Sequence, residues 1–205
     1  MKKLLFLIPY SLFLYSAHAA VDAALVQRAE TYLNNITGLT GDFTQVSGGR
    51  TDTGKFSMLR PGRVRLDYNR TPIQLIADGR DLYFFDKSLD QITTVPLTST
   101  PAGILVRPNI NLRTADISVS ETKSDANTFS LRMHIKETPG LGNMLMAFDN
   151  NPVLLRGWTV TDATGTATEI KFSNLKTQTN FARNFFTIQR HRIVSPASGG
   201  DAFFE

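Results

Sequence analysis

The chain has 205 residues, of which 41% are hydrophobic and 20% are charged, with 22 Lys and Arg against 18 Asp and Glu and no cysteine. The ordinary apolar fraction excludes a disordered polyelectrolyte, and the length favours one domain. Without cysteine there is no disulfide, no thiolate nucleophile, no Cys-bound metal and no Cys-linked lipid anchor. The composition therefore indicates a globular protein and excludes several classes of enzyme.

The first 19 residues have the pattern of an export signal. Two lysines precede an apolar run over residues 4–15, and the small-x-small sequence Ala-His-Ala ends at Ala19. The run is too short to span a bilayer, and a proline within it disfavours a buried helix. We therefore predict a signal peptide over residues 1–19. The signal peptide carries two lysines and no acidic residue, so its removal lowers the formal net charge of the chain from +4 to +2.

The mature chain, predicted as one domain over residues 20–205, begins with an amphipathic helix. Over residues 22–36 the apolar side chains recur at spacings of three and four, which places them on one face: Leu25, Val26, Ala29, Tyr32, Leu33 and Ile36. Asp22 is a candidate cap at the start, and Gly38 can end the helix. Glu30 and Arg28 leave the polar face without the basic excess of membrane-surface helices, so packing on the domain is favoured.

Most of the remaining chain alternates apolar and polar residues with a period of two. Nine such runs lie within residues 43–45, 56–58, 64–68, 73–77, 82–84, 129–135, 144–148, 154–160 and 170–172. Turn residues such as Asp78-Gly79 lie between runs and join adjacent antiparallel strands. We predict a mainly β protein of about eleven antiparallel strands with one solvated face.

One segment interrupts the strands. Thr100 as a cap and Pro101 at the first helical position predict a short helix that ends before Pro108. Two helices are too few to cover the apolar face of eleven twisted strands. The sheet either folds over itself as a packed sandwich or stays partly open, with the helices as a lid over an apolar cavity. The pattern alone does not decide between these alternatives, although a packed core is the commoner outcome.

Catalytic patterns are weak. His134 and His191 show no metal-ligand spacing, and no nucleophile or phosphate-binding motif occurs, so we expect no catalytic residues, no metal and no cofactor. The aspartates between residues 78 and 90 could form a carboxylate pair for glycosyl chemistry, but each borders a hairpin and fits a turn better. Enzyme activity is the minority hypothesis.

A cluster of arginines raises the question of whether the chain binds nucleic acid. Arg60, Arg63, Arg65 and Arg70 cluster around Tyr68. Two of them, Arg63 and Arg65, alternate with apolar residues, which predicts the solvated face of a strand rather than a base-stacking platform. With a low net charge after signal removal, we expect no nucleic acid. A protein or an acidic headgroup fits these arginines better.

Several segments together resemble one family. These are residues 54–68, which include the Arg60-Pro61 pair, then residues 75–86 and 89–92, Thr100-Pro101, Phe43-Thr44-Gln45 and residues 185–188. In their order and spacing they are similar to the periplasmic outer-membrane lipoprotein carriers of the LolA family. The likeness covers almost all of the mature chain.

The resemblance implies a half-open antiparallel β-barrel with a helical lid over an apolar cavity, and a periplasmic chaperone without enzymatic activity. Such a carrier receives acylated lipoproteins from an inner-membrane lipoprotein-releasing ABC transporter and delivers them to an outer-membrane acceptor; a monomer is expected. Each exposed methylene costs about 0.8 kcal/mol in water, so acyl chains need a carrier. The acceptor is itself a Cys-linked lipoprotein, and the missing cysteine argues for the carrier.

The resemblance also implies a site. Arg60 matches the arginine that locks the lid, and its expected acceptors are the backbone carbonyls of Leu33, Leu105 and Val106. A guanidinium has five donors, which suits carbonyls at helix ends. Val64 stands where many carriers have an aromatic residue. The candidate cavity wall, any member of which could instead pack under a helix, is Phe56, Met58, Val64, Leu66, Leu75, Phe84, Met133, Met144, Met146 and Trp158.

A second function stays open. The same half-barrel occurs, by resemblance, in periplasmic sensors and in binders of other lipids or hydrophobic ligands, and fold alone does not assign a task. The tail over residues 194–205 has little pattern and is expected to form either a loose end or an added strand.

Overall fold

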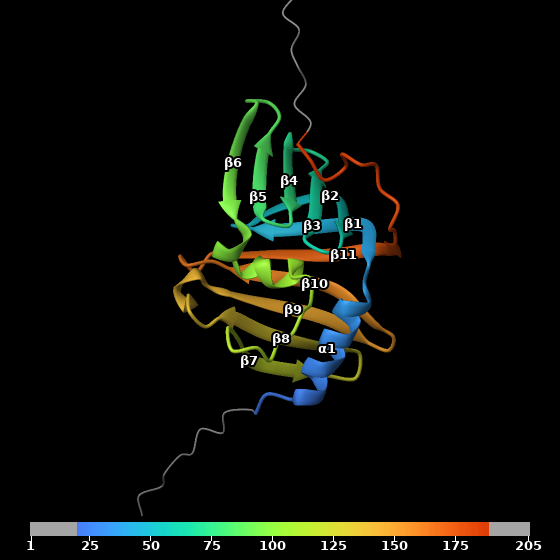
Figure 1. Ribbon diagram of the computed structural model, residues 1–205, viewed down its shortest axis with the longest axis vertical. Coiled ribbons are helices and arrows are strands. Elements are labelled where there is room, and N and C mark those ends of the chain that lie inside the picture. The colour runs from blue at the N-terminus through green and yellow to red at the C-terminus, as the bar shows by residue number, and fades with distance from the viewer. Residues whose placement is uncertain (1–19, 189–205) are drawn as a thin grey trace, which may run out of the picture.

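A computed structural model describes residues 20–188. The predicted signal peptide and the tail over residues 194–205 therefore lie outside the described residues. One α-helix near the start of the chain is followed almost entirely by strands (Figure 1). With η for 3-10 helices, the elements are α1 (Ala23–Asn35), β1 (Gly38–Ser47), β2 (Arg50–Leu59), β3 (Arg63–Tyr68), β4 (Ile73–Asp78), β5 (Asp81–Asp86), β6 (Gln91–Pro96), η1 (Leu97–Ser99), η2 (Pro101–Val106), β7 (Ile117–Ser124), β8 (Thr128–Ile135), η3 (Pro139–Leu141), β9 (Asn143–Asn150), β10 (Val153–Thr161) and β11 (Ala167–Thr177).

The eleven strands form one antiparallel sheet. Their order is β6-β5-β4-β3-β2-β1-β11-β10-β9-β8-β7, so each strand pairs with its chain neighbour except where β1 pairs with β11. Strands β6 and β7 end the sheet and do not pair with each other. The sheet is therefore an open half-barrel, which confirms the predicted fold class.

Two of the eleven strands, β6 and β7, contain none of the nine alternating runs found in the sequence. Strand β6 carries only Ile92 and Val95 as apolar side chains on its ladder, too few to establish a period of two. Strand β7 has a bulge between Val119 and Glu121, which breaks the alternation.

Helix α1 begins as the sequence predicts. The Asp22 carboxylate accepts hydrogen bonds from the backbone N–H groups of Ala24, at 2.8 Å, and Leu25, at 3.3 Å. The predicted end is wrong: Gly38 is the first residue of β1, and the helix stops at Asn35 because Ile36 is already extended.

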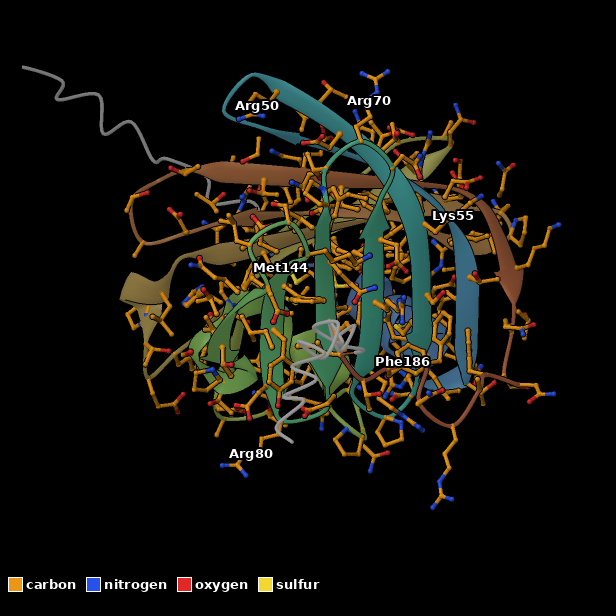
Figure 2. The ribbon with its side chains drawn as sticks, turned by 90° about the horizontal axis from the view of Figure 1, so that it is seen from above. Arg50, Lys55, Arg70, Arg80, Met144 and Phe186 are labelled. Atoms are coloured by element: carbon orange, nitrogen blue, oxygen red, sulfur yellow. The ribbon has the colours of Figure 1, made fainter. Side chains whose placement is uncertain are left out.

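The concave face of the sheet holds the core. The register places Met146 opposite both Leu131 and Trp158, and Trp158 opposite Ile170, so these side chains share one face. Helix α1 packs on β8 and β10, and η2 packs on β9 (Figure 1). Figure 2 shows Met144 inside the molecule, whereas Arg50, Lys55 and Arg80 point outward. The lid thus covers the half of the sheet from β8 to β10 densely.

The convex face of β3 to β5 is less exposed than the sequence predicts. The segment at residues 181–188 lies on it, and Ile76 and Phe186 are both buried. The Arg65 guanidinium lies 4.7 Å from the centre of the Phe185 ring, and it donates a hydrogen bond of 2.6 Å to the Phe185 carbonyl. The expectation that Arg65 belongs to a solvated face is therefore wrong, because aromatic side chains from a distant segment cover this part of the strand.

Asp67 completes this contact. Its carboxylate accepts from Nε of Arg65 at 2.6 Å and from the side-chain amide of Gln74. Burial raises the pKa of Asp67, but the hydrogen bonds from Arg65 and Gln74, together with the nearby charges of Arg65 and Lys87, outweigh burial and leave the pKa below its usual value. The convex face therefore carries an ionised, hydrogen-bonded group under the aromatic segment.

Candidate functional site

An apolar cavity of about 330 Å³ lies on the concave face, between strands β3 to β5 and the 3-10 segment. Fifteen side chains line it: Gln45, Val64, Leu66, Tyr68, Leu75, Ala77, Leu82, Phe84, Leu97, Thr100, Leu105, Trp158, Val160, Thr168 and Ile170. Strands β3 to β5 have no α-helix packed on this face, so their inward side chains remain available to a ligand. The cavity follows from the shortage of helices that the sequence reveals.

Half of the predicted wall lies in this cavity. Val64, Leu66, Leu75, Phe84 and Trp158 line it, and the register explains why: Leu66 faces Leu75, which in turn faces Phe84. Phe84 is 40% exposed, an unusual position for a phenylalanine and one that suits a rim. Contact of these five residues with a ligand stays a prediction.

The other five predicted wall residues lie in the packed core instead. Phe56, Met58, Met133, Met144 and Met146 do not line the cavity, and all are buried. The reason is position along the sheet: the three methionines of β8 and β9 lie in the half of the sheet under α1 and η2, and the Phe56 ring packs against Phe172 and Trp158. Alternation identifies the inward face, but it does not say which part of that face a helix covers.

One end of the cavity is polar. The Tyr68 hydroxyl donates a hydrogen bond of 2.6 Å to the side-chain carbonyl of Gln45. Burial, with a smaller effect from the negative charge of Asp52, raises the pKa of Tyr68 to about 12. Tyr68 therefore remains a neutral hydrogen-bond donor at every physiological pH. The alternation did not reveal this pair, although Gln45 and Tyr68 stand on inward positions of β1 and β3.

Arg60, just after β2, joins the sheet to the lid. Its Nη1 donates to the carbonyl of Leu33 in the last turn of α1 at 2.8 Å, and its Nη2 donates to the carbonyls of Arg107 and Pro108, each also at 2.8 Å. Burial lowers the pKa of the guanidinium, but arginine stays charged in proteins. One side chain therefore connects a strand end, the lid helix and the chain that follows η2.

Leu33 is an acceptor of Arg60, as predicted, and the other two acceptors lie beyond the predicted segment, at Arg107 and Pro108. Among the described side chains and their bonds, none joins Arg60 to the carbonyl of Leu105, and Val106 stays a prediction. The segment is a 3-10 helix that ends at Val106, and the extended backbone after it presents the carbonyls of Arg107 and Pro108 to the guanidinium. Leu105 contributes its buried side chain to the cavity instead.

A second set of bonds ties α1 to the chain after η2. Glu30 is 4% exposed; its carboxylate accepts from the Leu112 N–H at 2.7 Å and pairs with Arg113 Nη2 at 2.6 Å. Asn34 exchanges two hydrogen bonds with the backbone of Ile110, at 2.8 and 2.9 Å. The lid therefore consists of α1 and the chain around residues 107–113, held together by side chains that the sequence analysis did not single out.

The spacing of Glu30 from its apolar neighbours already indicates, in the sequence, that this carboxylate is buried. Glu30 lies four residues after Val26 and three before Leu33, which places it on the buried stripe of the helix rather than on the polar face. A carboxylate on a buried stripe requires a partner. The backbone N–H of Leu112 and the guanidinium of Arg113 are that partner.

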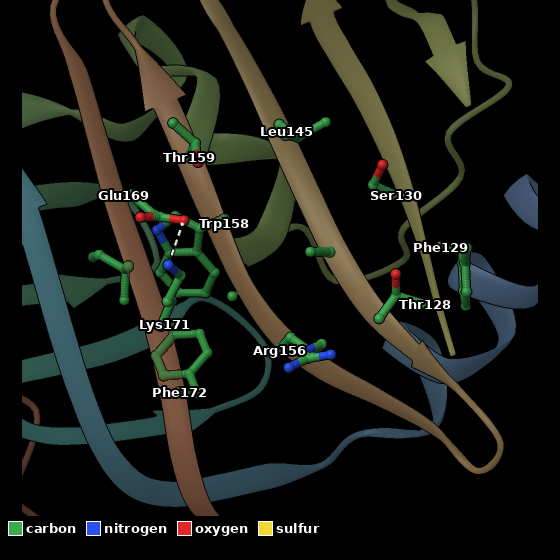
Figure 3. A pocket seen from close by; sticks show the side chains of 13 residues that line it. Thr128, Phe129, Ser130, Leu145, Arg156, Trp158, Thr159, Glu169, Lys171 and Phe172 are labelled. Carbon is green, nitrogen blue, oxygen red and sulfur yellow. Dashed lines mark ion pairs between the residues drawn. The ribbon is translucent and has the colours of Figure 1, made fainter. Parts of the chain in front are cut away.

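A larger hollow lies on the opposite, convex face. It has a volume of about 470 Å³, and Leu145 and Ala147, which flank the inward-facing Met146 on β9, line it. Figure 3 shows its polar rim, where Lys171 forms an ion pair of 3.2 Å with Glu169. Small residues on neighbouring strands open this hollow, and the charged groups of Arg156, Glu169 and Lys171 in its mixed lining do not suit an acyl chain.

The candidate catalytic groups have structural partners. The Asp78 carboxylate accepts from the N–H groups of Arg80 and Asp81, and the Asp86 carboxylate accepts from Ser88 and Leu89, all within tight turns. Between residues 20 and 188, no three His, Asp or Glu side chains come together as a metal site. In the same range no helix has the length and apolar character needed to cross a membrane.

An open antiparallel half-barrel with an apolar cavity under a helical lid defines the class of this protein. The chain belongs to the LolA family: the sequence model for the outer membrane lipoprotein carrier protein LolA matches residues 34–189. The chain is 29% identical over 174 residues to an outer-membrane lipoprotein carrier protein of Ralstonia nicotianae, with 77% of this chain and 80% of that protein covered.

Other relatives extend the match. An outer-membrane lipoprotein carrier protein of Methylobacillus flagellatus is 25% identical over 197 residues, which cover 91% of this chain and 92% of that protein. Among solved structures, a DUF1329 family protein from Desulfovibrio piger is similar with a TM-score of 0.50 and 11% identity, over 80% of this chain and 95% of that one. At this identity the structural likeness shows a shared fold alone.

Proposed function

We propose that this protein is a periplasmic chaperone that carries acylated lipoproteins from the inner membrane to an acceptor at the outer membrane. The observation that carries the proposal is the apolar cavity closed by a lid that one arginine holds through backbone carbonyls. The family membership and the names of the relatives support the same task.

The cavity has the chemistry that acyl chains require. Leu66, Leu75, Phe84 and Trp158 offer aliphatic and aromatic surface, and within the part of the chain that the structure describes no charged side chain is part of its wall. Each acyl methylene that is transferred from water into the cavity contributes about 0.8 kcal/mol to the free energy of binding. No hydrogen-bond donor or acceptor of the ligand is needed along most of this wall, so the site selects for apolar length rather than for a particular headgroup.

The size of the cavity requires the lid to move. About 330 Å³ is near the lower end of the range for drug-sized ligands, about 300–1000 Å³. The acyl chains of a lipoprotein need more room, and the space is gained by moving η2 away from β3 to β5. Arg60 bonds both the last turn of α1 and the chain that follows η2, so breaking its three hydrogen bonds couples opening to loading.

The remaining features of the proposal concern its surroundings. Residues 1–19 direct export and are removed, and residues 20–205 act as one monomeric domain without catalysis. Cargo arrives from a lipoprotein-releasing ABC transporter in the inner membrane and leaves to an outer-membrane acceptor. Nucleic acid is not among the proposed ligands, and Arg60 and Arg65 of the arginine cluster are engaged with backbone carbonyls instead.

Mass spectrometry of bound ligand tests the proposal. The protein is purified from the periplasm of cells blocked in lipoprotein transfer, and its ligand is extracted and identified. An acylated peptide or an intact lipoprotein is expected. Phospholipid alone would overturn the proposal in favour of a carrier or sensor of another lipid, and a processed sugar or peptide product would return an enzyme to consideration.

A further inference from the structure

The two edges of the open sheet are built differently. Strand β7 carries Glu121 and Lys123, has a bulge after Val119, and accepts the N–H of Asp22 on the hydroxyl of Thr122 at 2.9 Å. Charges and bulges are the usual protection of an edge against pairing with another chain. Strand β6, with the sequence Gln-Ile-Thr-Thr-Val-Pro, has no charged residue and pairs with β5 in regular register throughout. Strand β7 is protected along its length, whereas β6 has only Pro96, at its end, as a protecting residue.

The outward backbone groups of β6 can be assigned from the register. The N–H of Leu97 donates to the Arg80 carbonyl at 3.0 Å and continues the pairing in which Pro96 faces Asp81. Backbone groups alternate in direction along an antiparallel strand, so Thr93 bonds β5 while Ile92 and Thr94 direct N–H and C=O away from the sheet. Within the described part of the chain, nothing accepts or donates to these outward groups.

This edge borders the cavity. Leu82 and Phe84 on β5 line the cavity, Phe84 pairs with Thr93 of β6, and Leu97, directly after β6, lines it as well. In Figure 1, β6 lies at the outer side of the β3 to β5 lobe with no element beyond it. A strand added along β6 therefore continues the cavity wall: its inward side chains lie next to those of Thr93 and Val95, one strand beyond the exposed Phe84 ring.

We propose that the edge of β6 binds the polypeptide of the cargo, in extended form, as a twelfth strand beside the cavity that holds its acyl chains. The occupant is the segment directly following the acylated residue, because Phe84 and Leu97 place this edge beside the cavity in which the proposed function puts the acyl chains. Backbone hydrogen bonds supply affinity without requiring a particular sequence, which suits a carrier of many cargoes. This inference rests on the proposed function.

A backbone substitution isolates the contact. Thr94→Pro removes one outward N–H and also places the proline ring in the path of an added strand, so it blocks the pairing as a whole. An edge strand tolerates proline where its nitrogen faces solvent, the position that Pro96 already occupies. Thr94→Val is the matched control, since it keeps the N–H and a β-branched side chain. Neither variant touches a residue that lines the cavity.

Two probes separate the edge from the cavity. The first is a triacylated Cys-Ser dipeptide, and the second is the same lipid followed by a polar peptide long enough to span β6. The wild-type protein is expected to bind the long probe about tenfold more tightly, the gain from two or three backbone hydrogen bonds. Thr94→Pro should bind both probes with the affinity that the wild type has for the dipeptide, and Thr94→Val should keep the preference.

Amide hydrogen exchange of the wild-type protein provides a measurement without a variant. The N–H groups of Ile92 and Thr94 should gain protection with the long probe and not with the dipeptide. Equal affinity of the wild type for both probes, a preference that survives in Thr94→Pro, or unchanged protection each overturns the inference while leaving the carrier proposal intact. Concentration-dependent dimerisation lost in Thr94→Pro would assign the edge to a second copy and also overturn it. Failure of the dipeptide to bind would instead overturn the proposed function.

Discussion

The guanidinium of Arg60 and the backbone carbonyl oxygen of Leu33 lie 2.8 Å apart, and this bond joins the end of strand β2 to the last turn of helix α1. No carboxylate among the described residues pairs with Arg60, so its charge is balanced only by carbonyl dipoles. A bond set of this kind is stable enough to hold a lid closed, yet it can be exchanged for water without leaving a buried opposite charge.

Arg60→Leu should favour the open lid. The variant loses three charge-assisted hydrogen bonds, and the closed state is expected to lose about 2 to 4 kcal/mol relative to the open one. Cargo should then be retained, with transfer to the acceptor slowed more than tenfold, which a release assay with purified carrier and acceptor measures. Arg80→Leu is the control, because the side chain of Arg80 is 90% exposed and makes no lid contact. Normal transfer by Arg60→Leu would refute the latch.

Cavity wall and packed core should respond in opposite ways to truncation. Phe84→Ala should weaken binding of a fluorescent acyl probe about tenfold and cost less than about 1 kcal/mol of stability, since Phe84 is half exposed at the rim. Met146→Ala should cost about 2 to 4 kcal/mol, because it leaves a void in fully buried surroundings. Probe titration and urea denaturation of both variants measure these effects. Similar profiles for the two would contradict the division of the concave face.

The sequence predicts the sheet better than it predicts the site, and the reason is the range of the interactions. Alternation and turn residues are local, so the strands around Leu66 and Met146 and the capping by Asp22 follow from neighbouring residues. Whether an inward side chain lines a cavity depends on where the lid helices pack. Met146 and Leu66 have the same pattern, but η2 packs on β9, the strand of Met146, whereas Leu66 lies on β3 and lines the cavity.

The lid and the convex face show the same limitation. The acceptors of Arg60 depend on where the 3-10 segment ends, and so Arg107 and Pro108, which follow that end, accept where the sequence suggested residues within the segment. The cover over Arg65 comes from Phe185, which is 120 residues away in the sequence. A periodic pattern in β3 contains no information about that partner.

Acidification should weaken the contact between the sheet and the segment at residues 181–188. The pKa of Asp67 is lowered in the folded state, so its ionised form contributes stability above the unfolded pKa, and this contribution is lost as the pH falls through the folded pKa. At neutral pH, Asp67→Asn should cost about 1 to 2 kcal/mol, because the hydrogen bonds from Arg65 to a charged acceptor are weakened.

Urea denaturation of the wild type and of Asp67→Asn at a series of pH values measures this contribution. The difference in unfolding free energy between the two proteins should shrink as the pH falls from about 5 to about 3. A difference that stays constant over this range would show that the ionised carboxylate does not stabilise the fold. The latch should show no such change, since Arg60 does not titrate there.

Glu30 offers a test of whether the lid moves as one body. Glu30→Ala leaves the Leu112 N–H without its acceptor and removes the partner of Arg113, so the free energy of unfolding should fall by about 2 kcal/mol. Glu30→Gln keeps an acceptor for Leu112 and should lose less. Hydrogen exchange around residues 110–113 should rise in Glu30→Ala well above its rise in Glu30→Gln.

Combining this variant with Arg60→Leu separates two mechanisms of opening. If α1 and the chain around residues 107–113 open together, Arg60 closes them as one body in the wild type. Without Glu30 the two parts are joined mainly by the Asn34–Ile110 bonds, and Arg60 acts on each part only through its own bonds to it. Arg60→Leu should then slow transfer less in the Glu30→Ala background than in the wild type, which gives a coupling of about 0.5 to 3 kcal/mol between the two side chains. If the effects of Arg60→Leu and Glu30→Ala on transfer are strictly additive, α1 and the chain after η2 open independently, and Arg60 holds each of them by a separate bond.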